Sequence, residues 1–274
     1  MKAPDFTYLR PASLPDAIAM LADHDGAAMP LAGGQSLMPM MNFRVAAPAA
    51  LVDLADIAEL TGITLADGTL EIGAMTRYVT LMHDANVQCA APLIGLALPH
   101  IAHDAIRNRG TIGGSLALAD PAAEMPAIAC VLDAQIVLAG PDGTRTLPAR
   151  EFFLGYYETA RAPDELIVKV RIPAATAAQR FGFHELTQRH GDYALAGAAA
   201  MRDGGTWRAA FFGIADRPLC LDAVDAALAA GHSAKDACAA LAEAEIADDA
   251  KASAATRRRL AAVALTRAIS EMPA

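Results

Sequence analysis

The chain has 274 residues, of which 54% are hydrophobic and 19% charged, and this is the composition of a folded protein rather than a disordered one. Its 22 basic and 31 acidic residues give a formal net charge of −9, which argues against a binding surface for nucleic acid or an anionic membrane. A chain of this length is expected to form two or three lobes that share interfaces.

The first part of the chain alternates short strands with a helix. Strands are predicted at 6–9, 29–32 and 50–54, and Ser13 is expected to cap a helix whose apolar residues fall on one face. The longest charge-free run, 26–43, is broken by prolines and glycines, which excludes a membrane span. The first 55 residues therefore indicate a small α/β unit with an exposed loop at a strand end.

The middle of the chain carries the clearest strand signals. Asp67-Gly68 lies between alternating apolar residues and predicts a tight hairpin. Strands are also predicted at 135–139 and 165–172, and in the second of these apolar residues recur at every second position. That alternation places Leu166, Val168, Val170 and Ile172 on one face.

The last hundred residues combine strands with alanine-rich helices. Strands are predicted at 180–186 and 207–214, followed by helical segments around 221–230, 234–244 and 254–269. In the last helix, the apolar packing stripe is expected to consist of Leu260, Val263 and Ile269. The basic run Arg257 to Arg259 in this helix is expected to be its solvated face.

Two glycine motifs stand out from the rest of the chain. The first reads AGGQSL, from Ala32 to Leu37, and the second reads TIGGSLALADPAAEMP, from Thr111 to Pro126. A Gly-Gly pair beside a small hydroxyl residue lets the backbone curl and turns several N–H groups into one concavity, which suits an anion. One such motif is typical of an ordinary turn, whereas two in one chain favour a cleft that holds a diphosphate between them.

Several common kinds of site are excluded by their missing motifs. The chain lacks G-x-G-x-x-G, the P-loop sequence and the glycine spacing of a serine nucleophile elbow. The four cysteines are too scattered to provide zinc or iron–sulfur ligands, and His100 and His103 lack a third ligand in register. We therefore predict no metal site and no catalytic nucleophile in this chain.

The order of four segments resembles a known family. The segments AGGQSLMPMMNFR, HIAHDAIRNRGTIGGSLALADPAAEMPA, DELIVKVRIP and RHGDYALAGAAA follow one another as in the FAD-binding medium subunit of the molybdenum hydroxylases, the family of xanthine dehydrogenase and aerobic carbon monoxide dehydrogenase. The resemblance covers nearly the whole chain. It implies an α+β fold, with a two-subdomain FAD-binding domain of the PCMH or vanillyl-alcohol-oxidase type at 1–175 and a C-terminal α+β domain, a small antiparallel sheet with helices, at 176–274. The two subdomains are expected at about 1–55 and 56–175.

The resemblance also implies which residues bind FAD. Both glycine motifs would cradle its diphosphate, through Ala32, Gly33, Gly34, Gln35, Ser36, Leu37, Thr111, Gly113, Gly114 and Ser115.

Four further residues would contact the rest of the cofactor. Glu124 would lie near the ribityl or ribose hydroxyls, Ile101 would pack against the isoalloxazine ring, and Tyr193 of the GDY motif would cover the flavin from the other domain. Ile167 would meet the adenine half through backbone groups. The structural alternatives are a packed core tyrosine for Tyr193 and a solvated or helix-capping carboxylate for Glu124.

Two positions depart from the family pattern. Leu118 stands where many relatives carry His or Asn, so a polar side chain near the flavin is lost. Glu185 stands where some relatives have Lys, which would remove a direct charge contact to the cofactor.

The function implied by the resemblance is electron transfer. A small partner subunit would hold two 2Fe-2S clusters and a large one the molybdenum cofactor, in a dimer of heterotrimers in the cytoplasm; FAD would pass electrons to an external acceptor. Charged residues at Asp5, Arg10 and Asp16 agree with a protein without a secretory signal. The alternatives are a self-sufficient flavin oxidase or reductase and a non-catalytic nucleotide-binding assembly module.

Overall fold

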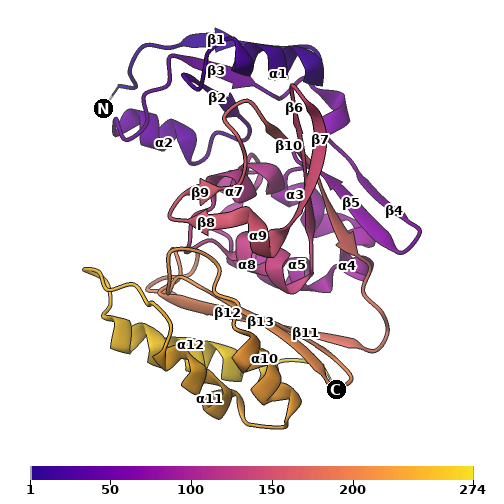
Figure 1. The fold of residues 1–274 in the computed structure, drawn as a ribbon, viewed down its shortest axis with the longest axis vertical. Helices are drawn as coiled ribbons and strands as arrows, with labels where there is room; N and C mark the ends of the chain where they lie inside the picture. The colour runs from indigo at the N-terminus through magenta and orange to yellow at the C-terminus, as the bar shows by residue number, and fades with distance from the viewer. Residues whose placement is uncertain (1, 274) are drawn as a thin grey trace.

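The computed structural model describes residues 2–273 of the chain (Figure 1). Three layers follow one another down the long axis of the molecule: an N-terminal lobe, a five-stranded sheet with its helices, and a C-terminal sheet with its helices. No helix within residues 2–273 has both the length and the apolar character needed to cross a membrane.

The N-terminal lobe is a three-stranded parallel sheet in the order β1-β3-β2. The predicted helix start is confirmed, because Ser13 Oγ accepts a hydrogen bond from the N–H of Asp16 at 3.3 Å and Pro15 lies in the first turn. The first glycine motif forms the loop that follows β2, as expected for a loop at a strand end. The elements are β1 (Thr7–Leu9), α1 (Leu14–Ala22), β2 (Ala28–Leu31), α2 (Leu37–Asn42) and β3 (Ala50–Asp53).

The middle layer is an antiparallel sheet in the order β4-β5-β10-β6-β7. The predicted hairpin is confirmed: Asp67 and Gly68 join its two strands with φ angles of 50° and 72°. Its strands are β4 (Ile63–Ala66), β5 (Thr69–Gly73), β6 (Gln135–Gly140), β7 (Gly143–Pro148) and β10 (Leu166–Pro173). A separate hairpin is formed by β8 (Phe153–Gly155) and β9 (Glu158–Thr159).

Short helices fill the space between this sheet and the C-terminal layer, and one of them begins inside the second glycine motif. The short helices are α3 (Tyr78–His83), α4 (Ala85–Ala90), α5 (Pro92–Ala97), η2 (Leu98–His100), α6 (Asp104–Arg107), α7 (Ile112–Leu118), α8 (Glu124–Val131) and α9 (Ala149–Phe152). The turn η1 (Ala58–Leu60) lies apart from them, with Leu60 in the core beneath the N-terminal lobe.

Strand β10 does not keep the simple alternation that its sequence predicts. The pairing of β10 with β6 shifts between Ile167 and Lys169, which marks an irregularity of the β-bulge kind. Leu166 and Val168 pack in the core beneath the N-terminal lobe, whereas Val170 and Ile172 pack in the core of the middle layer. The prediction of one continuous apolar face was therefore wrong, because the extra residue turns the strand over.

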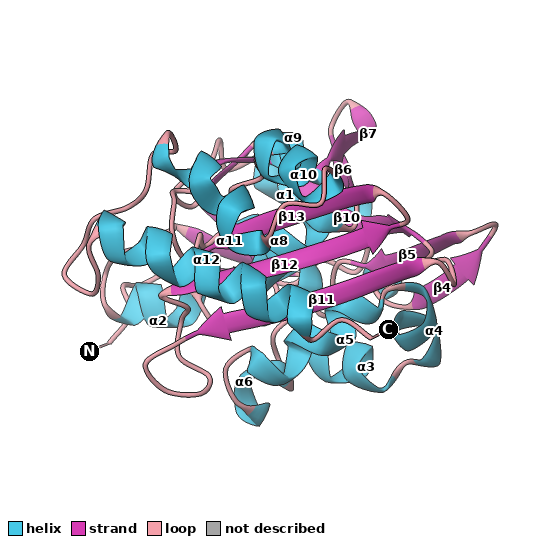
Figure 2. Ribbon diagram, turned by 90° about the horizontal axis from the view of Figure 1, so that it is seen from below, coloured by secondary structure: helices cyan, strands magenta, loops and turns pink. Residues whose placement is uncertain are grey.

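The C-terminal layer is an antiparallel sheet in the order β11-β12-β13, covered on one face by helices (Figure 2). Its other face lies against α5 and α8 of the middle layer. The strands are β11 (Gln179–Leu186), β12 (Ala196–Asp203) and β13 (Thr206–Phe212), and the helices are α10 (Asp222–Ala229), α11 (Ala234–Ala237), η3 (Cys238–Ala242) and α12 (Ala254–Ser270).

The packing face of α12 differs from the predicted stripe. Val263 is 40% exposed, and the buried residues of the helix include Ala261, Ala264 and Ala268. These small side chains let the helix approach the sheet so closely that a Cβ on Gly182 would lie 1.9 Å from the carbonyl oxygen of Ala268. Leu260 and Ile269 of the predicted stripe do pack against this core, so the prediction was wrong only at Val263; the buried Leu265 and the alanines complete the packing face.

Candidate functional site

The first glycine loop joins β2 to α2 and presents free backbone donors. Gly34 has a φ angle of +71°, a left-handed conformation that favours glycine, and the side-chain amide of Gln35 donates a hydrogen bond to Gly33 O at 2.8 Å. Within residues 2–273, the N–H groups of residues 33–37 have no hydrogen-bond acceptor; the next one, Met38 N–H, donates to Gly34 O. Consecutive N–H groups of this kind form an anion-binding concavity.

The second glycine motif is built differently, because its donors are already used inside the chain. Thr111 is the N-cap of α7, and its hydroxyl accepts from Gly114 N–H at 3.1 Å while its carbonyl accepts from Ser115 N–H at 3.1 Å. Gly113 N–H donates to Ala74 O at 2.8 Å. This motif therefore contributes a rigid, capped helix start rather than a set of free N–H groups.

The two glycine motifs lie against each other. A Cβ on Gly33 would be 2.1 Å from the carbonyl oxygen of Arg109, two residues before Thr111, and a Cβ on Gly114 would be 3.3 Å from the Cβ of Ala32. The glycines thus bring two stretches that are distant in the sequence into backbone contact. The expected pairing of the motifs on one cleft is in accord with this geometry.

The second motif carries a buried carboxylate near its end. Glu124 opens α8 and is 7% exposed, and burial raises its pKa to about 8, with the nearby Glu185 and Asp120 adding to the effect. The alternative of a solvated loop carboxylate is therefore wrong for Glu124. A carboxyl group with this pKa is largely protonated at pH 7, so it can donate as well as accept a hydrogen bond.

Glu185 adds a second buried carboxylate from β11. Its Oε1 atom lies 3.5 Å from Nδ1 of His100, and its Oε2 atom is buried with no hydrogen-bond partner among residues 2–273. An unsatisfied buried oxygen of this kind is costly unless a bound group donates to it. The His100 ring packs against the Phe183 ring at a tilt of 54°, with 5.1 Å between their centroids, so His100 supports the surroundings of Glu185 rather than a metal site.

Ile101 and Tyr193 come from loops that touch. Gly191, in the GDY motif, has a φ angle of +83°, and a Cβ there would lie 2.8 Å from Ala102 O, next to Ile101. Arg107 fixes this bend by donating to Ile101 O at 2.7 Å. The ring of Tyr193 is 55% exposed, so the alternative of a packed core tyrosine is wrong.

The hydroxyl of Tyr193 lies near a buried carboxylate. Burial and the nearby carboxylate of Asp120 raise the pKa of Tyr193 to about 12. Ile167, the residue expected to meet adenine, is buried in β10, the central strand of the middle sheet, where it pairs with Leu138.

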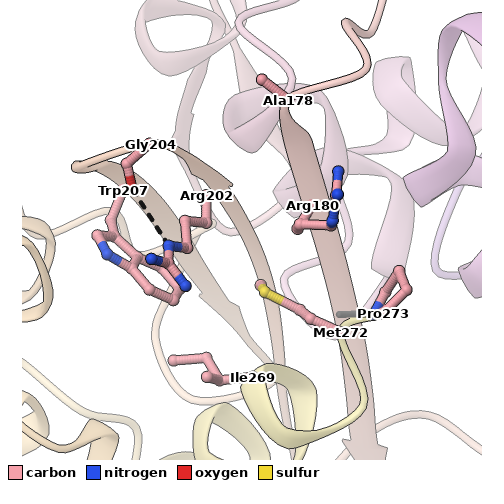
Figure 3. Close-up of a pocket in the computed structure, with 8 residues that line it drawn as sticks. All are labelled: Ala178, Arg180, Arg202, Gly204, Trp207, Ile269, Met272 and Pro273. Carbon is pink, nitrogen blue, oxygen red and sulfur yellow. Dashed lines mark hydrogen bonds between the residues drawn. The ribbon is translucent and has the colours of Figure 1, made fainter.

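Two surface pockets lie outside the contact between the glycine motifs. One, of about 410 Å³, lies at the end of the C-terminal sheet, where the guanidinium of Arg202 stands 5.6 Å from the Trp207 ring (Figure 3). The other, of about 360 Å³, is lined by Tyr193, Gly191 and Lys251 among others. Only the second includes a residue predicted from the sequence to bind the cofactor.

The sequence did not reveal Arg257, which holds the C-terminal side of this region. Its Nη1 atom donates to Leu195 O at 2.7 Å and to Gly213 O, and its Nη2 atom pairs with Asp249 at 2.7 Å. The arginine is 4% exposed, so the expected solvated face was wrong at this position. The N–H group of Gly213 donates a hydrogen bond to Pro121 O at 2.7 Å, which ties the end of β13 to the second motif.

Comparison with known proteins accounts for this arrangement. Residues 4–175 match the family described as the FAD binding domain in molybdopterin dehydrogenase. The carbon monoxide dehydrogenase medium chain of Afipia carboxidovorans is 38% identical over 98% of this chain and 97% of its own length. Caffeine dehydrogenase subunit beta of a Pseudomonas species is 41% identical over 73% of this chain and 68% of its own.

Solved structures agree in fold over the whole chain. A chain of carbon monoxide dehydrogenase from Hydrogenophaga pseudoflava superimposes with a TM-score of 0.93 at 38% identity, covering 98% of both chains. A chain of quinoline 2-oxidoreductase from Pseudomonas putida 86 gives a TM-score of 0.92 at 37% identity, covering 99% of this chain and 98% of its own. The resemblance inferred from the sequence is confirmed: the chain belongs to the family of FAD-binding medium subunits of molybdenum hydroxylases.

Proposed function

We propose that this chain is the FAD-carrying electron-transfer subunit of a molybdenum hydroxylase complex, and that FAD binds where the two glycine motifs meet. The observation that carries the proposal is the run of N–H groups at residues 33–37, which have no acceptor within residues 2–273 and lie against the second motif. Backbone donors would hold the diphosphate without a lysine, in keeping with the acidic chain.

Different parts of the site would hold different parts of the cofactor. In this proposal the second motif shapes the wall of the cleft, because Gly113 and Gly114 let its backbone pack closely against Ala74 and Ala32. Glu124, protonated near neutral pH, would bind ribityl or ribose hydroxyls. Ile101 and Tyr193 would pack on the isoalloxazine ring from adjoining loops, and the backbone of Ile167 would meet the adenine half.

Bound FAD would supply a group that accepts electrons singly and releases them singly or in pairs. The protein's own contribution is to position the ring and limit its contact with water. Residues 2–273 contain no cluster of three or more His, Cys, Asp or Glu that could hold a metal ion, so iron–sulfur and molybdenum ligands would come from the other subunits. The relatives named as carbon monoxide dehydrogenase medium chains support small and large partners.

We also propose where the domains of the chain begin and end and how the complex is assembled. We place the boundary between the FAD-binding domain and the C-terminal domain at 175/176, with subdomains at about 1–55 and 56–175. The complex would be a dimer of heterotrimers in the cytoplasm, with an external electron acceptor.

Purification of the chain with and without its partners tests this proposal. The full chain alone is expected to carry FAD with a flavin absorbance spectrum, and the co-purified complex to contain iron and molybdenum as well. Reduction of the flavin by substrate should require the partner subunits. A chain without flavin would support the assembly-module alternative, and direct reduction of the isolated chain by a small substrate would support the self-sufficient enzyme.

A further inference from the structure

Asp120 lies at a junction of three segments near the proposed flavin site. It follows the C-terminus of α7, is 7% exposed, and accepts a hydrogen bond from Ala122 N–H at 2.9 Å through Oδ1. Its Oδ2 atom lies 3.4 Å from the hydroxyl of Tyr157, which donates to it from the β8–β9 hairpin. The carboxylate of Asp120 also lies near Tyr193, whose pKa it helps to raise, so two tyrosines from separate segments converge on one buried acid.

The backbone around this junction is held in uncommon conformations. Tyr157 has a φ angle of +55° in the two-residue turn between Gly155 and Glu158, where glycine or asparagine is normally preferred. Ala119, directly before Asp120, has a φ angle of +53°. Non-glycine residues in the left-handed region persist where surrounding contacts hold them, and they cluster at functional sites. The contact between Tyr157 and Asp120 accounts for a tyrosine at this turn position.

Both tyrosine rings are exposed although their hydroxyl groups meet at a buried carboxylate. Tyr157 is 57% exposed and Tyr193 is 55% exposed. The charged and titratable groups that face this junction are Glu124, from α8, and Lys251, from the segment before α12. Burial raises the pKa of Asp120, while the hydrogen bonds from Ala122 N–H and the Tyr157 hydroxyl lower it and so favour the carboxylate that accepts them.

We propose that Asp120 is a positioning residue that binds the hydroxyl groups of Tyr157 and Tyr193, and thereby holds the β8–β9 hairpin and the 187–195 loop together as the cover of the flavin. This inference rests on the proposed function, because it assigns Tyr193 to the flavin. Asp120 acts only through the two tyrosines. We therefore expect Tyr157, which lies outside the residues assigned to FAD, to control how far the flavin is exposed to solvent.

The test compares the full chain with the variants Tyr157→Phe and Asp120→Asn after loading with FAD. Tyr157→Phe removes one hydroxyl group. Tyr156→Phe is the matched control, because Tyr156 is a similarly exposed neighbour that makes no hydrogen bond to Asp120. The readouts are FAD content, collisional quenching of flavin fluorescence by acrylamide, and the rate at which oxygen oxidises the photoreduced flavin.

Tyr157→Phe is expected to raise acrylamide quenching and the oxidation rate about threefold, as expected for the loss of one hydrogen bond, and Asp120→Asn to raise both at least as much, because it weakens the contacts to both tyrosines; FAD content should be unchanged. The double variant should not exceed Asp120→Asn alone, because Tyr157 acts through Asp120. Should Asp120→Asn fail to fold, Tyr157→Phe against Tyr156→Phe still decides the matter.

Different results would overturn the inference about Asp120 and the proposed function. If the unaltered chain binds FAD but Tyr157→Phe behaves like Tyr156→Phe, the inference about Asp120 is overturned while the proposed function stands. Additive effects in the double variant would also overturn it. If the unaltered chain binds no FAD, the proposed function is overturned, and the inference falls with it.

Discussion

The two glycine motifs use the same residue types in opposite ways. In the first, the N–H groups of residues 33–37 have no acceptor within residues 2–273, and Gly34 is left-handed so that the loop can curl. In the second, Gly113, Gly114 and Ser115 have donated their N–H groups to Ala74 and Thr111. Both motifs use a glycine for close backbone packing, Gly33 against Arg109 and Gly113 against Ala74, but only the first leaves its N–H groups without acceptors.

This difference separates affinity for an anion from the shape of the cleft. The first motif packs against the second through Gly33 and is otherwise held by its own turn, whereas the second is tied to the sheet through Ala74 and to the C-terminal domain through the hydrogen bond between Pro121 and Gly213. Changes in the first should therefore weaken FAD binding with little effect on folding. Changes in the second should affect both.

The largest effect is expected for Gly113→Val. A Cβ at Gly113 would lie 2.5 Å from the Cβ of Ala74 and 2.7 Å from its carbonyl oxygen, and backbone atoms cannot rotate away. We expect FAD binding to be lost and the free energy of unfolding to fall by about 3 kcal/mol. Urea unfolding and flavin absorbance measure the two losses, and loss of FAD alone would contradict the packing role of this motif.

A pH-dependent effect is expected from the buried acid near the end of the second motif. The pKa of Glu124 is raised from 4.5 to about 8, so the folded FAD-free protein binds a proton more tightly than the unfolded chain does. Stability should therefore fall as pH rises from about 4.5 to about 8, by up to about 1.4 kcal/mol for each pH unit, and then level off. Glu124→Gln is expected to lose this dependence.

Urea unfolding of FAD-free protein at several pH values between 5 and 8.5 measures this slope for both proteins. Glu124→Gln should be closest to the unaltered protein near pH 5 and more stable than it at pH 8. The same slope in both proteins would place the titrating group elsewhere.

Arg257→Ala tests the brace between the second motif and the C-terminal domain. Asp249 is 47% exposed and can return to water, so the main cost comes from the carbonyl oxygens of Leu195 and Gly213, which lose their donor. At about 1 kcal/mol for each oxygen, the free energy of unfolding should fall by about 2 kcal/mol. Arg259→Ala, at an exposed position of the same helix, is the control and should change stability by less than about 0.5 kcal/mol.

Gly34→Ala addresses the first motif. A Cβ there would have only side-chain neighbours, at 3.3 and 3.4 Å, but a φ angle of +71° costs alanine about 1 kcal/mol. We expect FAD affinity to fall about tenfold as the N–H groups shift and a charge-assisted hydrogen bond is lost, while the protein stays folded. Fluorescence titration with FAD measures the change. Unaltered affinity would indicate that this loop does not hold the phosphates.

The smallest effect is expected for Gly95→Ala, which serves as a control for every glycine variant. Gly95 lies in α5, and a Cβ there would have no neighbour within 4 Å. Alanine should stabilise the helix by about 0.5 kcal/mol and leave FAD binding unchanged. Any loss of FAD in this variant would mean that glycine substitution acts through the fold as a whole.

Local signals in the sequence were sufficient where structure is local. Asp67-Gly68 encodes a hairpin through its backbone preferences, and Ser13 encodes a helix start through its cap. The bulge in β10 could not be foreseen, because an apolar Val168 fits either face. The prediction that Val263 packs was wrong because the packing face of α12 is set by its contact with Gly182, on a distant strand.

In the candidate site, too, residues whose environment depends on distant segments could not be predicted from the sequence. The motifs identify both glycine loops, but the N–H group of Gly113 is occupied because it donates to Ala74, which lies in neither motif. Likewise, Arg257 sits in a run of arginines that looks solvated, and its burial follows from carbonyl groups of Leu195 and Gly213. Contacts between residues far apart in the chain leave no pattern in a single sequence.

The central claim is that the N–H groups of residues 33–37 hold the FAD diphosphate while the second motif shapes the cleft. Hydrogen–deuterium exchange of the full chain, with and without FAD, tests it most directly. We expect the amides of residues 33–37 to change from fast to slow exchange when FAD binds, and those of residues 113–115, which already have acceptors, to change little. FAD binding that leaves residues 33–37 exchanging as fast as before would contradict the account.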